Sequence, residues 1–160
     1  MIEIERKWLV SKLPDLKWIK QKSYKRYFLF IGKTVEVRIQ KVDSKYIFEV
    51  KEENNKLSSI KHVLKISKKV FEELKKTCNK FIVRDSYVIQ QKPEISVKIY
   101  HRDFKGLIRV EAEFNSEIEA NEFKPLSWFG TEITHTKLGK DKELFKLNKA
   151  EFNLLLKKYS

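Results

Sequence analysis

The chain opens with the segment IEIERKWLV, residues 2–10, in which Glu3, Glu5 and Lys7 occupy alternate positions. Side chains two apart share one face of a β-strand, so the two carboxylates and the ammonium point one way while the isoleucines between them point the other. Acidic residues form strands poorly, and like charges on one face repel. A hard divalent cation would offset that repulsion because it prefers carboxylate oxygens, and Lys7 would meet the phosphates that such ions accompany. A solvated edge strand with unrelated charges is the other interpretation.

Composition favours a folded protein of one domain, residues 1–160. The chain is 41% apolar and 12% aromatic, which is typical of a globule that buries a core. No apolar run approaches the roughly 20 residues that span a bilayer, and the charged N-terminus does not resemble a secretory signal. We therefore expect a cytoplasmic protein without a membrane partner. Cys78 is the only cysteine, which excludes an intrachain disulfide and a thiolate metal cluster.

The chain carries a net charge of +13, from 35 Lys and Arg against 22 Asp and Glu. Such an excess predicts a polyanionic partner: nucleic acid, phospholipid or polyphosphate. A genome with biased base composition would also produce a lysine-rich chain. The placement of the charges must therefore decide between these interpretations.

Alternation of apolar and polar residues predicts eight strands, and side chains that cap helix N-termini predict three helices. The strands are expected at 2–10, 24–31, 33–41, 45–52, 58–66, 81–90, 94–101 and 106–114. The helices are expected from Ser67 to about residue 79, from Ser116 to before Pro125, and from Asn148 onward, with a short helical turn around 14–19. So many antiparallel segments in one domain favour a closed or nearly closed sheet, because closure removes exposed edges.

One face of these strands is apolar and the other is densely charged. A solvent-facing sheet gives the same alternation, but acids paired at i and i+2 at both ends of the sheet argue against that explanation. The charged face is expected to carry Glu36, Arg38, Gln40, Glu49, Lys51, Lys61, Val63, Lys65, Arg84, Ser86, Ser96, Lys98, Tyr100, Arg109, Glu111 and Glu113.

The opening Glu3-x-Glu5-x-Lys7 resembles the E-x-E-x-K motif of the CYTH superfamily, the triphosphate tunnel metalloenzymes, which include thiamine triphosphatases, tripolyphosphatases and class IV adenylyl cyclases. Further segments are similar to family motifs in the same order: residues 37–38 to V-R-x-R, 48–51 to T-x-K, 106–113 to G-L-x-x-x-E-x-E, and 128–134 to W-F-G-x-E-V-T. The resemblance implies an α+β fold, an eight-stranded antiparallel β-barrel whose charged face lines a tunnel, with a few helices outside.

The resemblance also implies a function: divalent-metal-dependent hydrolysis of tripolyphosphate or of a nucleoside or thiamine triphosphate. Carboxylate and phosphate oxygens suit Mg²⁺ or Mn²⁺, and the arginine fork suits phosphate. The expected partner is thus a small-molecule triphosphate or polyphosphate. The implied metal ligands are Glu3, Glu5, Glu111 and Glu113, and the implied catalytic residues are Glu3, Glu5 and Lys7. The implied phosphate-binding residues are Lys7, Arg38 and Lys51, with Arg84 in place of a family lysine. Arg109, an inward base that the resemblance does not lead us to expect, is a further candidate for phosphate binding.

Several positions depart from the family pattern. Gln40 stands where the V-R-x-R strand has its second arginine, Ser86 replaces a base, and Lys98 replaces an aspartate, while Lys61, Val63 and Lys65 fill a strand that carries carboxylates in the family. Lys98 or Lys65 could neutralise a carboxylate that should bind the ion.

These departures leave a second hypothesis open: a degenerate tunnel that binds polyphosphate or a phosphorylated ligand without cleaving it. A nucleic-acid interface on the outer surface is not expected, because basic residues interleaved with aromatic platforms are not assembled in the sequence.

Overall fold

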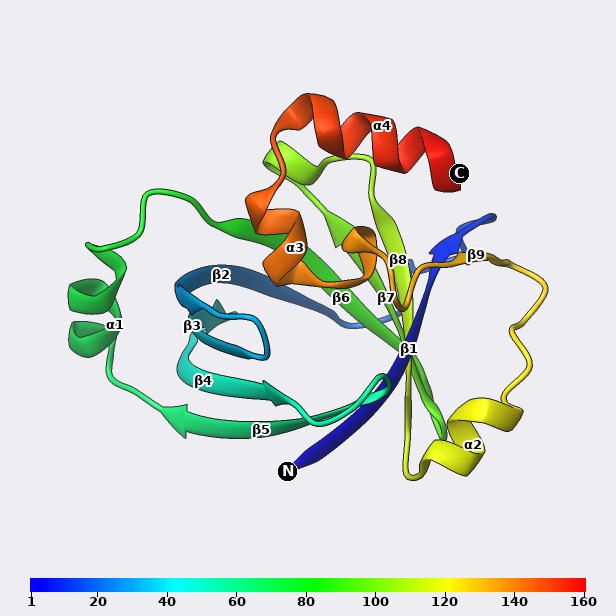
Figure 1. Cartoon of the computed structure of the whole chain (residues 1–160), viewed down its shortest axis with the longest axis horizontal. Helices are drawn as coiled ribbons and strands as arrows, with labels where there is room; N and C mark the ends of the chain where they lie inside the picture. The colour runs from blue at the N-terminus through cyan, green and yellow to red at the C-terminus, as the bar shows by residue number, and fades with distance from the viewer.

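The computed structural model describes residues 1–160, and antiparallel strands wrap around a central space in it (Figure 1). The strands are β1 (Ile2–Val10), β2 (Gln21–Ile31), β3 (Val35–Val42), β4 (Lys45–Glu53), β5 (Ser58–Lys65), β6 (Ile82–Gln91), β7 (Glu94–Tyr100), β8 (Ile108–Phe114) and β9 (Phe129–Glu132). The helices are α1 (Lys68–Lys75), α2 (Glu117–Glu122), α3 (Asp141–Lys146) and α4 (Lys149–Tyr159), with 3₁₀ turns η1 (Arg102–Phe104) and η2 (Lys137–Gly139).

Eight of the strands close into a barrel, as predicted. The order is β5-β4-β3-β2-β6-β7-β8-β1, and β1 returns to β5 through the pairs Ile2↔Ile60 and Ile4↔Ser58. The short strand β9, which the sequence did not predict as a strand, is added beside the end of β1. The eight-stranded antiparallel barrel with a few helices is thus confirmed.

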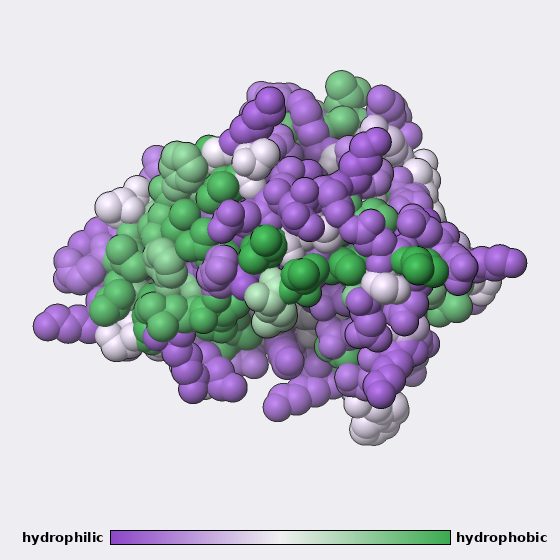
Figure 2. All heavy atoms as spheres, turned by 60° about the horizontal axis from the view of Figure 1, so that its bottom comes forward, coloured by the Kyte–Doolittle hydropathy of each residue, from purple (hydrophilic) through white to green (hydrophobic).

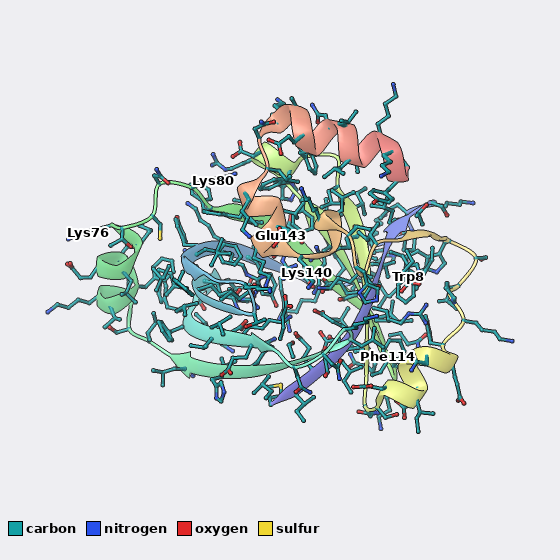
Figure 3. The ribbon with its side chains drawn as sticks, viewed as in Figure 1. Trp8, Lys76, Lys80, Phe114, Lys140 and Glu143 are labelled. Atoms are coloured by element: carbon teal, nitrogen blue, oxygen red, sulfur yellow. The ribbon has the colours of Figure 1, made fainter.

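The apolar core of this barrel lies on its outside. Trp8 on β1 packs with Phe123 and Phe129 beneath α2, and Figure 3 places Trp8 and Phe114 on that side. A second apolar cluster lies beneath α3 and α4, and a third lies beneath α1. Because strand side chains alternate between faces, burying the apolar residues under the helices turns the charged ones into the barrel.

The capping residues of three helices were predicted correctly. Ser67, Ser116 and Asn148 each accept a hydrogen bond from the backbone N–H three residues on. The helix after Ser67 ends at Lys75 rather than near residue 79. In the segment 14–19, where a short helical turn is predicted, the structure has a single hydrogen-bonded turn, in which Ile19 N–H bonds to the Leu16 carbonyl.

The outer surface is mostly polar, with one concentration of apolar residues. Figure 2 shows them gathered at the end of the molecule that carries α1 and the adjoining part of β5, where Val63, Leu64 and Val70 are exposed. None of the helices combines the length and the apolar character that crossing a membrane requires.

Candidate functional site

The barrel encloses a charged cavity of about 230 Å³, which we call the tunnel. Only three of its 31 lining residues are hydrophobic, and bases outnumber acids by twelve to nine. The positive excess suits an anionic ligand. Every candidate site residue named from the sequence lines this cavity: Glu3, Glu5, Lys7, Arg38, Lys51, Arg84, Arg109, Glu111 and Glu113.

Three carboxylates converge at one place on the tunnel wall. Oxygen atoms of Glu3, Glu5 and Glu113 all lie within 4.8 Å of one another. The strand register explains why, since Glu5 on β1 pairs directly with Glu113 on β8 and Glu3 is two residues from Glu5 on the same face. Burial, together with the negative charges of Glu3 and Glu5, raises the pKa of Glu113 to about 7. We call these three carboxylates the acid cluster, and Glu113 is the member whose ionisation burial and its neighbours oppose.

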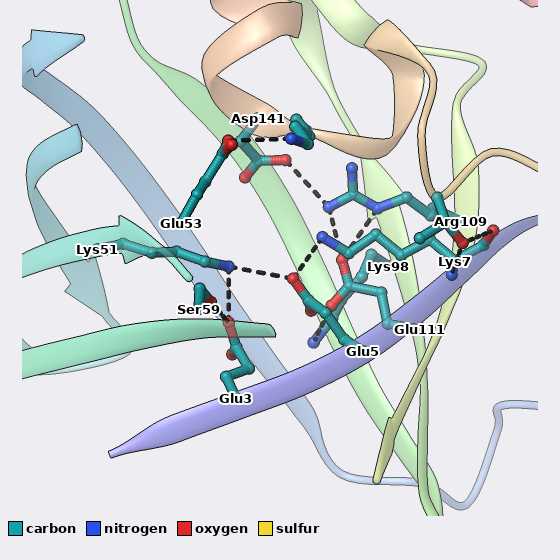
Figure 4. A network of polar contacts seen from close by, with 12 residues as sticks. Glu3, Glu5, Lys7, Lys51, Glu53, Ser59, Lys98, Arg109, Glu111 and Asp141 are labelled. Carbon is teal, nitrogen blue, oxygen red and sulfur yellow. Dashed lines mark hydrogen bonds and ion pairs between the residues drawn. The ribbon is translucent and has the colours of Figure 1, made fainter. Parts of the chain in front are cut away.

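Lysines contact two members of the acid cluster (Figure 4). Lys51 Nζ lies 2.6 Å from Glu3 and 3.1 Å from Glu5, and Lys61 Nζ lies 2.9 Å from Glu3. Lys7 Nζ lies 2.7 Å from Glu5. Burial opposes ionisation of Glu3, but Lys51 and Lys61 outweigh it and hold its pKa below the usual value. No such ion pair joins Glu113, which is the least compensated of the three.

Glu111, the fourth acid proposed as a metal ligand, has different surroundings. It does not belong to the acid cluster; instead Arg109 Nη2 lies 2.5 Å from its carboxylate, and Arg84 and Lys98 lie 3.5 and 3.6 Å away. These cations outweigh the effect of burial and hold the pKa of Glu111 well below its usual value. Glu111 is therefore an ionised acceptor within a cationic group.

The two lysines expected to compete with a metal ion differ in position. Lys98 is buried in the tunnel, donates to Ser86 Oγ at 2.8 Å and lies beside Glu111. Lys65 is exposed and does not line the tunnel, and neither does Val63, so their predicted place in the lining is wrong. The reason is that β1 pairs with β5 only as far as Ile60, so the rest of β5 pairs with β4 alone and forms an open edge of the sheet.

Arg38 and Arg84 are buried bases in the tunnel wall. Arg38 contacts Glu36 and Glu49 through its terminal nitrogens, and Arg84 donates to the Tyr100 hydroxyl at 3.1 Å. The Nε–H groups of both arginines are buried without a hydrogen-bond partner. Buried donors in this state are costly, and a phosphate oxygen is a ligand that would satisfy them.

Several tunnel residues were not predicted. Arg26 and Lys22 share the alternation of Tyr24 on β2, so period two along this strand could have identified them. Asp141 was missed for another reason: it is the first residue of α3, and the preceding Lys140 makes no side-chain cap to mark the helix start. The other missed lining acids and bases are Glu53, Lys56, Glu94, Lys140 and Lys142.

The acid cluster makes stability depend on pH in the metal-free protein. The folded-state pKa of Glu113, about 7, exceeds the ordinary value of 4.5, so its contribution to stability is present below pH 4.5 and is lost as the pH rises toward and through 7. We expect the free energy of unfolding, measured by urea denaturation in EDTA, to fall across that interval more steeply for the wild type than for Glu113→Gln. Parallel profiles for the two proteins would contradict this assignment.

Comparisons with known proteins fit this architecture. No protein-family model matches the chain. The inorganic triphosphatase of Nitrosomonas europaea is 29% identical over 147 residues, which is 90% of this chain and 97% of that protein. A solved structure of an inorganic triphosphatase superposes with a TM-score of 0.66 at 26% identity, covering 89% of this chain and 93% of the other.

More distant structures share the fold alone. A protein from Hippeastrum, described as a candidate adenylyl cyclase with a dominant triphosphatase activity, has a TM-score of 0.52 at 13% identity over 75% of this chain and 82% of that one. A candidate adenylate cyclase from Bacillus halodurans has a TM-score of 0.51 at 18% identity over 74% of this chain and 83% of that one. The same barrel fold therefore occurs in solved structures whose sequences have little identity with this one.

Proposed function

We propose that this chain is a divergent member of the CYTH superfamily of triphosphate tunnel enzymes and that it is a divalent-metal-dependent hydrolase of triphosphates. Inorganic triphosphate is the first candidate substrate, because the relative with 29% identity is an inorganic triphosphatase. Nucleoside and thiamine triphosphates carry the same recognised group. Residues 1–160 would act as one domain.

The observation that supports this function best is the meeting of the acid cluster with phosphate-binding bases in one closed space. Lys7 and Lys51 both contact the acid cluster within about 3 Å, and Arg38 and Arg84 line the same tunnel. A metal site beside cationic side chains is what a metal-bound polyphosphate requires.

The residues present fit a hard divalent ion. Glu3, Glu5 and Glu113 offer only oxygen ligands at mutual distances that one ion can bridge, and burial together with the neighbouring carboxylates raises the pKa of Glu113. We infer that these three hold Mg²⁺ or Mn²⁺. Glu111, engaged by Arg109, would orient the cationic side of the tunnel rather than contribute the main ligand.

The chemistry divides between the ion and the side chains. When bound, a divalent ion neutralises phosphate charge and polarises the phosphoryl group. Lys51 would exchange its two carboxylate partners for phosphate oxygens. Arg38 and Arg84 would donate hydrogen bonds to the phosphate chain through their unpartnered Nε–H groups. Hydrolysis adds water to the terminal phosphorus, breaks its P–O bond to the rest of the chain and releases phosphate from a leaving group that these cations stabilise.

A substrate and metal screen tests the proposal. We expect phosphate release from tripolyphosphate with Mg²⁺ or Mn²⁺ and none in excess chelator; pyrophosphate, ATP and thiamine triphosphate in the same plate define the substrate class. Equal release with and without chelator, or none from any triphosphate, would overturn metal-dependent hydrolysis.

A tunnel that binds without cleaving is the second candidate, because lysines already occupy the acid cluster. Lys51 and Lys61 bond to Glu3 and Lys98 lies beside Glu111, so a metal ion must compete with them at a cost on the order of a few kcal/mol. Saturable binding of tripolyphosphate in chelator, with no product on adding metal, would identify this alternative.

A further inference from the structure

Asp141 stands inside the tunnel among three arginines. Its carboxylate accepts from Arg26 at 2.5 Å and from Arg109 at 3.0 Å, and Arg84 Nη1 lies 3.5 Å away. The Tyr100 hydroxyl donates to it at 2.6 Å. The side chain of Asp141 is only 3% exposed. These contacts are what a buried phosphate group would make in an arginine site.

Three guanidinium groups, those of Arg26, Arg84 and Arg109, share two carboxylates, Asp141 and Glu111, so their positive charges outnumber their negative partners. Burial and the neighbouring Arg38 and Arg84 lower the pKa of Arg26, and Arg84 keeps a buried Nε–H without a partner. Arg109 divides its contacts between Asp141 and Glu111. The arginine group, Arg26, Arg84 and Arg109, thus retains capacity for anions that Asp141 only partly fills.

The position of Asp141 is fixed by the helix that carries it. On either side of it, Lys140 and Lys142 bond to Glu53 on β4 at 2.9 and 2.6 Å, while Asp141 reaches Arg109 on β8. The start of α3 therefore links β4 to β8, and Lys140, Asp141 and Lys142 all line the tunnel. At the other end of α3, Lys80 Nζ holds the carbonyls of Phe145 and Leu147.

We propose that Asp141 is a specificity-determining residue: its carboxylate occupies the arginine end of the tunnel and confines a bound phosphate chain to the remaining, lysine-rich length. The inference rests on the proposed function of the tunnel as a polyphosphate site. Its consequence is a limit on the length of the phosphate chain, because a phosphate added at this end would meet a fixed, buried negative charge.

The test is binding of pyrophosphate, tripolyphosphate and long-chain polyphosphate to Asp141→Asn, by calorimetry in EDTA so that hydrolysis plays no part. Replacing the carboxylate by an amide of similar volume removes an ionic partner from three arginines, of which Arg84 and Arg109 keep Glu111. We expect the affinity for long chains to rise at least about tenfold relative to that for pyrophosphate. Glu143→Gln is the matched control, since it removes one charge from the same helix at a residue that pairs with Lys146.

A second variant should shift the preference for chain length in the opposite direction, toward shorter chains. It keeps the negative charge that the buried arginines need for folding. Asp141→Glu extends the carboxylate further into the tunnel, so the ratio of tripolyphosphate to pyrophosphate affinity should fall about tenfold. Unchanged ratios in both variants, or equal changes at every chain length, would overturn the inference while leaving triphosphate binding intact. A wild type that binds none of the three probes in EDTA, and neither binds nor cleaves tripolyphosphate with Mg²⁺ or Mn²⁺, would instead overturn the proposed function.

Discussion

Glu3→Gln is expected to reduce metal-dependent phosphate release from tripolyphosphate by at least about 100-fold, since even loss of a residue that only supports a metal ligand costs about 10- to 100-fold. Glu3 lies in the acid cluster and is the shared partner of Lys51 and Lys61. The amide is nearly isosteric but neutral, so it weakens metal binding, leaves Lys61 without its carboxylate and leaves Lys51 with Glu5 alone. Phosphate release with Mn²⁺, combined with calorimetric Mn²⁺ binding, measures both effects.

The matched control for this variant is Glu52→Gln. Glu52 neighbours the tunnel residue Lys51 on β4 but points outward, with an exposed side chain. The control should keep wild-type turnover and wild-type Mn²⁺ affinity. Robust turnover by Glu3→Gln would remove the acid cluster from the mechanism, whereas loss of turnover with unchanged Mn²⁺ affinity would assign Glu3 to substrate binding instead.

Period-two patterning was enough to predict most of the barrel and most of its lining. In a strand, which face a residue occupies follows from its parity, so once one face is apolar the other is determined. That rule places Glu36, Arg38 and Glu49 inside without any knowledge of the strand order. Helix starts could also be predicted from capping side chains, because Ser67 and Asn148 accept hydrogen bonds from backbone groups only three residues away.

The failures arise where position depends on distant contacts. Parity is correct for Lys65, but the wall ends before it, because the pairing of β1 with β5 stops at Ile60. Asp141 enters the tunnel through a six-residue helix that tertiary contacts hold in place, including the bonds of Lys140 and Lys142 to Glu53. Such contacts join residues far apart in the sequence. Neither the exposure of Lys65 nor the entry of Asp141 into the tunnel could therefore be predicted from strand alternation or helix caps.

The second large effect expected is the loss of stability on replacing Arg38. Arg38→Gln leaves Glu36 and Glu49 buried without the guanidinium that contacts both. Removing one partner of a buried ion pair typically costs about 3–5 kcal/mol, and urea denaturation measures it. Affinity for tripolyphosphate should fall as well, by about 10- to 100-fold, because a charged hydrogen bond contributes about 1.5–3 kcal/mol.

The double variant Arg38→Gln/Glu49→Gln separates these two effects. It restores the original net charge of the buried group, and Glu36 keeps Lys51 as its cross-strand neighbour. Stability should therefore recover by at least half, while tripolyphosphate affinity stays as low as in the single variant, because neither variant has a guanidinium at position 38 to bind phosphate. If affinity returned together with stability, Arg38 would act only by holding the barrel wall, and the phosphate would have to be bound by Lys7, Lys51 and Arg84 alone.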